Sequence, residues 1–161
     1  MTVRIGQGFD VHAFAEHRKL MLGGIEVNYH LGLAGHSDAD VLIHAVCDAL
    51  LGAAGLGDIG HHFPDNDQQY KGIDSRKLLS QVMKTLHDLG WKVGNLDATV
   101  IAQNPKLASY IPEMRACLAG LLSVDVGVCN IKATTTEKLG FTGRGEGIAA
   151  QAVVLLETDL D

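Results

Sequence analysis

The chain has 161 residues and a mass of 17.1 kDa, which is most simply one domain, residues 1–161, large enough to bury a proper core. Hydrophobic residues make up 47% of the sequence and charged residues 20%, a globular composition that argues against a disordered chain. The formal charge is −6 and no basic stripe is present, so we expect neither nucleic acid nor a membrane surface as a partner.

The cysteines and the N-terminal residues indicate the compartment. Cys47, Cys117 and Cys129 lie far apart in apolar surroundings without metal-binding spacing, which favours free thiols in a reducing environment. No signal pattern or transit peptide is visible, and no apolar run approaches the roughly 18 residues that a membrane span needs. We therefore expect a cytoplasmic protein, or one in an organelle stroma after import.

The first third of the chain predicts two strands and a helix. Residues 3–12 and 20–27 are expected to be strands, the second with a bulge or bend at Gly23 and Gly24. Ser37 is a candidate N-cap because an acidic residue follows three positions later, and its helix is expected to run to about residue 54.

The remainder of the chain predicts two more helices and three more strands. Residues 55–72 are polar and glycine-rich, and connections of that length are usually functional or disordered. Asp74 is expected to cap the next helix, and Pro112 stands at the start of the last one. In chain order, we expect a helix over 74–87, a strand over 96–103, a helix over 111–122, a strand over 128–135, a glycine-rich loop over 137–147 and a strand over 148–156.

This order of elements favours an α+β fold. Strands and helices do not alternate strictly, so we expect a two-layer sandwich, with a mixed four-stranded sheet and helices layered on one face. Residues 148–156 are apolar at both inner and outer positions, which indicates that the second face is also buried. In so small a chain, an oligomer is the economical explanation.

Three side chains form a candidate metal site. Asp10 and His12 leave the same face of a strand, because strand side chains alternate with period two. His44 lies in a helical pattern and can meet them from a second element. One carboxylate and two imidazoles suit zinc with an open fourth position.

Two acidic residues share a helix face with His44. Asp40, His44 and Asp48 are spaced four apart, so they are either a solvated polar face or a site in which Asp40 or Asp48 orients an imidazole. The other histidines are interpreted as structural or simply exposed, and they are His17, His30, His61, His62 and His87.

Two segments have the composition of phosphate sites, with ordinary turns as the alternative. The glycines beside Asp58 would let backbone N–H groups approach a phosphate or a ribose, and Asp65 lies in a second acidic turn. Residues 132–138 place three hydroxyl groups beside Glu137, a carboxylate that could hold magnesium together with substrate phosphates. No motif for a covalent serine or cysteine nucleophile is present.

Four motifs occur in order and cover almost the whole chain: Gly-Phe-Asp-Val-His at 8–12, His-Ser-Asp-Ala-Asp-Val at 36–41, Gly-Asp-Ile-Gly-His-His-Phe-Pro-Asp at 57–65, and the long segment 132–147. Together they resemble the 2-C-methyl-D-erythritol 2,4-cyclodiphosphate synthase family of the non-mevalonate isoprenoid pathway. The resemblance implies an α+β homotrimer with active sites between neighbouring subunits.

The resemblance also implies roles for individual residues. Asp10, His12 and His44 correspond to zinc ligands, and Glu137 to the carboxylate on a second divalent ion, Mg²⁺ or Mn²⁺, that bridges the diphosphate. Thr135 is expected to act with them in catalysis. The implied substrate contacts include His36 and Ser37 in a mobile loop over the diphosphate, Asp58 and Gly60 near the sugar-like part, and Asp65. Around the cytidine and its phosphates they are Ala102, Pro105, Lys106, Leu107, Ala108, Ala133, Thr134 and Thr135. Phe141 and Arg144 match a region near the trimer axis where related enzymes can hold an isoprenoid diphosphate.

The implied reaction converts a cytidine diphosphate-linked methylerythritol 2-phosphate to the cyclic diphosphate with release of CMP. A zinc-dependent phosphohydrolase and a non-catalytic, metal-containing scaffold are the alternatives. The sequence departs from the family pattern at Ala39, where glycine is common, and at residues 106–108 of the cytidine stretch.

Overall fold

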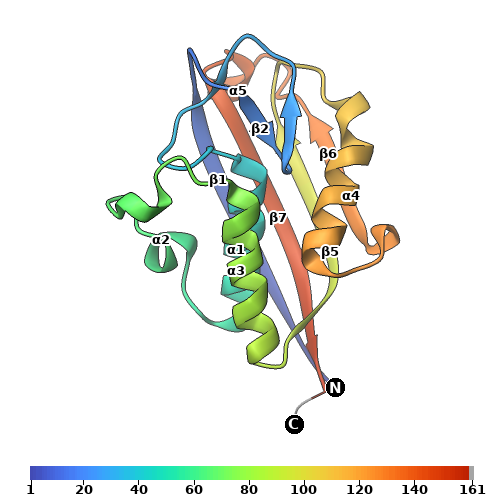
Figure 1. The fold of residues 1–161 in the computed structure, drawn as a ribbon. Coiled ribbons are helices and arrows are strands. Elements are labelled where there is room, and N and C mark those ends of the chain that lie inside the picture. Colours follow the sequence, from blue (N-terminus) through green and yellow to red (C-terminus); the bar gives the residue numbers. More distant parts are fainter. Residues whose placement is uncertain (160–161) are drawn as a thin grey trace.

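The computed structural model describes residues 1–159 as a mixed sheet covered on one face by helices (Figure 1). The sheet has five strands in the order β4-β1-β7-β5-β6, and only the β5–β6 pair is parallel. The strands are β1 (Thr2–Ala15), β4 (Gly32–Leu33), β5 (Lys92–Ile101), β6 (Cys129–Thr134) and β7 (Gly147–Thr158). The predicted α+β fold with helices on one side is thus confirmed.

Three long helices form the second layer. They are α1 (Val41–Ala54), α3 (Ser75–Asp88) and α4 (Ile111–Leu122), and the apolar side of each faces the core. Two short helices, α2 (Ile59–His62) and α5 (Gly140–Gly143), lie within the loops predicted over 55–72 and 137–147. No helix within residues 1–159 is long and apolar enough to cross a membrane.

Two strand predictions were wrong. The sheet has a fifth strand, because Gly32 and Leu33 pair with Ala15 and Phe14 at the end of β1. Two residues are too few to show a period-two pattern, so this strand has no signal in the hydrophobic pattern.

Residues 20–27 form a separate hairpin rather than one bent strand. Its strands are β2 (Leu20–Leu22) and β3 (Ile25–Val27), which pair with each other and not with the main sheet. Gly23 and Gly24 have φ values of 60° and 78°, and a two-residue hairpin turn of type I′ needs positive φ at both positions.

Helix α1 begins later than predicted, and Ser37 is not its cap. Asp40 is the N-cap, and the backbone of Ala39 has a positive φ of 58° just before it. The fully buried Asp40 carboxylate accepts hydrogen bonds from the N–H groups of Ile43 at 3.0 Å, Gly23 at 2.9 Å and Gly24 at 2.7 Å. Burial raises the pKa of this group, while the backbone donors act against the rise. One carboxylate therefore fixes the hairpin to the start of α1.

Helix α1 lies directly on the backbone of β1. A Cβ atom at Gly6 would lie 1.9 Å from the carbonyl oxygen of Ala49, and one at Gly8 would lie 1.9 Å from that of Ala45. The strand positions must therefore lack side chains. Because His44 precedes Ala45, this contact sets the distance between His44 and the strand.

The second face of the sheet is uncovered within one chain. Its exposed apolar side chains include Val3, Ile5 and Phe9 on β1 and Val153 on β7, and Ile5 is 72% exposed. Monomeric proteins rarely leave contiguous apolar patches of this kind open.

We predict that Gly8→Ala destabilises the protein by about 1–3 kcal/mol, because the new methyl group collides with helix backbone that cannot rotate away. The free energy of unfolding in urea measures this loss. Gly120→Ala is the matched control: it lies in α4 with nothing within 4 Å of the new Cβ, and it should stabilise by about 0.5–1 kcal/mol. Equal effects of the two substitutions would contradict the packing argument.

Candidate metal centre and substrate pockets

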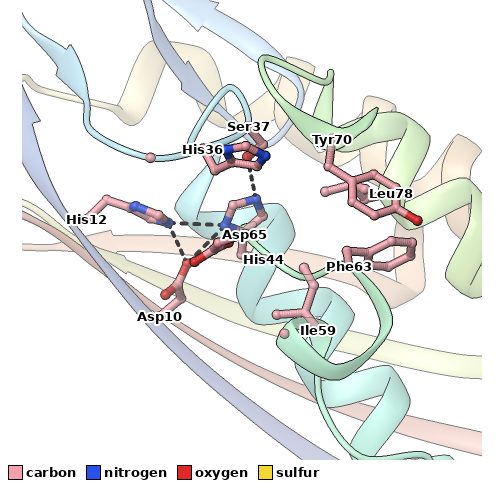
Figure 2. A pocket seen from close by; sticks show the side chains of 12 residues that line it. Asp10, His12, His36, Ser37, His44, Ile59, Phe63, Asp65, Tyr70 and Leu78 are labelled. Carbon is pink, nitrogen blue, oxygen red and sulfur yellow. Dashed lines mark hydrogen bonds and ion pairs between the residues drawn. The ribbon is translucent and has the colours of Figure 1, made fainter. Parts of the chain in front are cut away.

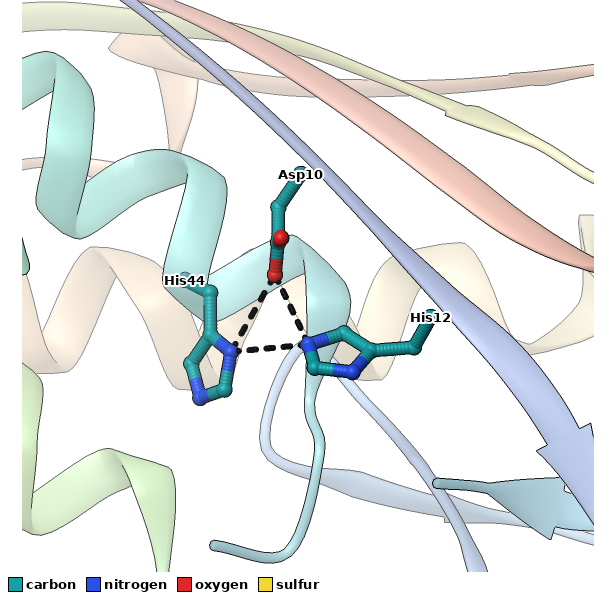
Figure 3. A group of neighbouring side chains, drawn as sticks. All are labelled: Asp10, His12 and His44. Carbon is teal, nitrogen blue, oxygen red and sulfur yellow. Dashed lines mark hydrogen bonds and ion pairs between the residues drawn. The ribbon is translucent and has the colours of Figure 1, made fainter. Parts of the chain in front are cut away.

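Asp10, His12 and His44 converge on one point, as the strand period and the helix predicted (Figure 3). Asp10 Oδ2 lies 2.8 Å from His12 Nε2 and 3.2 Å from His44 Nδ1, and the two nitrogens are 3.1 Å apart. The first two side chains come from β1 and the third from the first turns of α1. Three donor atoms so close together, one from a carboxylate and two from imidazoles, make a possible metal site.

The charges of this trio are coupled. Burial raises the pKa of the Asp10 carboxyl group, but hydrogen bonds with His12 and His44 outweigh it and hold the pKa below its usual value. Burial lowers the pKa of His12, but the hydrogen bond and the charge of Asp10 outweigh it and raise the pKa above 6.5. A proton on His12 Nε2, the nitrogen that faces Asp10, would therefore compete with a metal ion for that position.

Each imidazole is oriented through its other nitrogen. His12 Nδ1 donates to the carbonyl oxygen of Ala34 at 2.6 Å, which leaves the Nε2 lone pair for a metal. His44 Nε2 lies 3.1 Å from the hydroxyl oxygens of both Ser37 and Ser75. This donor set fits a zinc ion, because both inward nitrogens can be unprotonated while both outward ones are hydrogen-bonded.

The predicted orienting role of Asp40 or Asp48 was wrong. Asp40 is used as the helix cap, and Asp48 accepts a hydrogen bond from the backbone N–H of Ile59 at 2.8 Å. The actual partners, Ala34 and Ser75, carry no sequence signal: one contributes a backbone carbonyl group, and the other is an ordinary first-turn helix residue.

A cavity of about 220 Å³ opens beside the trio (Figure 2). Seven of its lining residues are among the predicted site residues: Asp10, His12, His36, Ser37, His44, Gly60 and Asp65. Sequence reasoning missed its apolar wall, which comprises Ile59, Phe63, Tyr70 and Leu78. The rings of Phe63 and Tyr70 pack edge to face with centroids 5.3 Å apart.

The turn at residues 57–60 contributes Ile59 and Gly60 to the lining of this cavity. Asp58 caps α2 by accepting the N–H of His61 at 2.8 Å. The bond from Ile59 to Asp48 ties the same turn to α1, one helical turn beyond His44. Gly60 thereby lines the same cavity as the trio, and Asp58 precedes it by two residues.

A second cavity, of about 230 Å³, brings together all eight residues predicted around the cytidine. It lies where the parallel strands β5 and β6 end side by side, and the N–H of Ala102 donates to the carbonyl oxygen of Thr134 at 2.9 Å. Its lining is Ala102, Gln103, Pro105, Lys106, Leu107, Ala108, Ala133, Thr134 and Thr135.

Four predicted site residues, Asp58, Glu137, Phe141 and Arg144, line neither cavity within residues 1–159. Glu137 is exposed in a left-handed backbone conformation, with φ of 53°, and its N–H donates to Thr135 Oγ1 at 3.1 Å. Arg144 pairs with Glu146 at 2.8 Å, and Phe141 is 40% exposed. The roles assigned to these four residues, like those assigned to the residues that line the cavities, stay predictions.

The fold and the trio define an α+β protein with a candidate metal-binding pocket. The YgbB family model matches residues 3–157, so the chain belongs to the YgbB family. It is 63% identical to a 2-C-methyl-D-erythritol 2,4-cyclodiphosphate synthase of Geobacter metallireducens, an alignment covering 96% of this chain and 99% of that one. A protein of the same name from Thiobacillus denitrificans is 61% identical over 96% of this chain and 97% of its own length.

Solved structures have the same fold. The bifunctional IspDF of Campylobacter jejuni superposes with a TM-score of 0.94 at 46% identity, and the alignment covers 98% of this chain but 42% of that longer one. The CDP complex of IspF from Plasmodium falciparum gives a TM-score of 0.85 at 33% identity, covering 98% of this chain and 97% of the other.

We predict that divalent metal binding near pH 6.5 releases protons, because the raised pKa of His12 keeps its ring protonated there without metal. Metal affinity should fall as the pH drops through that pKa, by about tenfold per pH unit for one proton displaced. Titration calorimetry in two buffers of different ionisation enthalpy measures the release. His17→Ala, at a 93% exposed side chain, should behave like the wild type. Buffer-independent heats and a flat affinity between pH 6 and 8 would contradict the coupling.

Proposed function

We propose that this chain converts 4-diphosphocytidyl-2-C-methyl-D-erythritol 2-phosphate to 2-C-methyl-D-erythritol 2,4-cyclodiphosphate and CMP. The observation that carries the proposal is the identity of about 60% with synthases of that name along nearly the whole chain. The Asp-His-His trio and the two cavities support it with a plausible chemistry.

In the proposed reaction, an oxygen of the 2-phosphate attacks the β-phosphorus, a new P–O bond closes the ring, and the bond to the α-phosphate breaks to release CMP. The nucleophile is already an anion, so the protein needs no serine or cysteine for covalent catalysis. Its task is to align the attacking and leaving oxygens and to neutralise crowded charge. Zn²⁺ held by Asp10, His12 and His44, and Mg²⁺ or Mn²⁺ held by Glu137, would supply that positive charge in a protein of net charge −6.

The two cavities suggest which residues would contact each part of the substrate. Asp58, Gly60 and Asp65 would contact the methylerythritol, and His36 and Ser37 would close over the diphosphate. The second cavity would hold the cytidine, largely through backbone groups, and Thr135 would contact the phosphates. The CDP complex of the Plasmodium falciparum relative supports a nucleotide site in this family.

The positions of the two cavities favour a site shared between subunits. Asp10 and His12 of the trio lie on β1 near one edge of the sheet, and the second cavity lies at β6 on the other edge. Three strand spacings, about 14 Å, separate them within one chain. A ring of three subunits would bring the β6 edge of one subunit to the β1 edge of the next and cover the apolar sheet face. In this ring, the exposed Phe141 and Arg144 would face an isoprenoid diphosphate near the axis.

The cytoplasm is the location that we propose. The three cysteines are free thiols, which supports a reducing compartment.

We predict that phosphorus NMR of the reaction shows a cyclic diphosphate forming in step with CMP. Glu137→Gln should slow turnover at least tenfold, because a neutral amide holds the second ion weakly, while zinc stays bound to the trio. The matched control is Glu146→Gln at the exposed glutamate that pairs with Arg144, and this variant should retain turnover. Inorganic phosphate, or CMP with a linear hydrolysed product, would contradict cyclisation and favour the phosphohydrolase.

We predict a trimer of about three times 17.1 kDa by light scattering at micromolar concentration. Ile5→Asp should dissociate it, because a charge would be buried in the apolar centre of the interface. Leu89→Asp changes an equally apolar but separate site, 50% exposed at the end of α3, and should leave the trimer intact. A wild-type mass near 17.1 kDa would refute both the assembly and the shared site.

A further inference from the structure

The outward nitrogen of His44 faces two hydroxyl groups that differ in their own hydrogen bonds. His44 Nδ1 points to Asp10 and His12, and its Nε2 lies 3.1 Å from Ser37 Oγ (Figure 2). The same Nε2 also lies 3.1 Å from Ser75 Oγ. A neutral imidazole carries one proton, so the direction of the bond at Nε2 decides whether Nδ1 has a free lone pair. A metal can bind at Nδ1 only when Nε2 is the donor.

Ser75 can only accept from His44. It is fully buried as the first residue of α3, and its hydroxyl group donates to Oδ1 of Asp38 in a short hydrogen bond. An ionised carboxylate has no proton to return, so the single hydroxyl proton of Ser75 is committed to Asp38. The Oγ lone pairs are then all that Ser75 can offer to Nε2.

Ser37 does not impose this direction. Its Oγ accepts the N–H of Ala39 at 3.1 Å, and its own proton is not committed to another acceptor among residues 1–159. Ser37 can therefore donate to Nε2 or accept from it. Of the two hydroxyl groups, only the one tied to a carboxylate selects a tautomer.

Asp38 is held in place by its other bonds. Its Oδ2 accepts the backbone N–H of Ser75 at 3.0 Å, and its Oδ1 also accepts the N–H of Asp40 at 3.1 Å. The carboxylate thus joins the start of α3 to the start of α1, which carries His44. Its position is fixed from both helices before any metal arrives.

We infer that Asp38 and Ser75 are positioning residues for the metal centre. The Asp38 carboxylate takes the Ser75 proton, Ser75 accepts the Nε2 proton of His44, and the Nδ1 lone pair is directed at the metal. Hydrogen bonding of this kind also makes the ligand nitrogen more basic. The carbonyl oxygen of Ala34 orients His12 in the same way by accepting the Nδ1 proton. A backbone group thus orients one imidazole, and a pair of side chains orients the other.

Backbone hydrogen bonds next to this pair also fix the loop beside the cavity. The N–H of Asp38 donates to the carbonyl oxygen of Ile73 at 3.0 Å, and the N–H of Gly72 donates to that of His36 at 2.7 Å. Residues 36–38 are therefore bonded along residues 72–75. Loss of the Asp38–Ser75 contact should weaken metal binding and loosen His36 and Ser37 together.

The test compares zinc affinity in Ser75→Ala and Asp38→Asn with that of the wild type. Competition with a chromophoric chelator should give dissociation constants about 10- to 100-fold larger in both variants. The absorption bands of the cobalt(II)-loaded proteins should also shift, since the ligand field at His44 changes. Ser80→Ala, at an exposed hydroxyl group on the same helix, is the matched control and should keep wild-type affinity.

Zinc binding by the wild type and by the variants tests two separate claims. The inference rests on the proposed zinc site but not on the reaction, so a wild type that binds no zinc refutes the site itself. If the wild type binds zinc and both folded variants bind it equally well with unchanged cobalt spectra, the positioning role alone is refuted. Circular dichroism of the metal-free variants identifies a folding defect, and the nearly isosteric Asp38→Asn then carries the comparison.

Discussion

The contact between the backbones of β1 and α1 is the constraint on which the metal centre depends. Gly6 and Gly8 let the carbonyl groups of Ala45 and Ala49 approach to distances that no side chain would allow. His44 is adjacent to this contact along the helix, and Asp10 and His12 follow it along the strand. Donor distances of 2.8–3.2 Å therefore result from how closely two regular elements pack. Asp40 complements this contact by fixing where the helix begins.

The candidate metal ligands and the rest of the pocket lie on different kinds of secondary structure. Asp10, His12 and His44 stand on a long strand and a buried helix, where packing restricts their rotamers. The cavity around them is lined mainly by residues 35–37 and by the connection 59–70, which contains the short helix α2. Hydrogen bonds that Asp48 and Asp38 accept from the backbone N–H groups of Ile59 and Ser75 connect these segments to the rigid helices. Such a division suits a site that must hold a metal firmly and still admit a large anionic substrate.

What could be predicted from the sequence was limited to local pattern and to family resemblance. The period of a strand placed Asp10 beside His12, and helical spacing identified α3 and α4 closely. The second cavity was predicted by resemblance, since its small residues have no chemical signature of their own. Two of the misses, β4 and the Ser75 contact, depend on partners distant in sequence, whereas Asp40 is held by the distant Gly23 and Gly24 as well as by the nearby Ile43. Tertiary contacts decided β4 and the Ser75 contact, and no short window of residues along the chain contains that information.

The location of the two cavities on opposite edges of the sheet has a genetic consequence. In the proposed ring, each site would combine the β1 edge of one subunit with the β6 edge of its neighbour. A subunit defective only at the trio and another defective only at the nucleotide cavity would be inactive separately. In a ring that contains both kinds of subunit, one site would combine the intact trio of one subunit with the intact nucleotide cavity of its neighbour. Alleles of this gene that damage different edges should therefore complement one another, whereas alleles that damage the same edge should not.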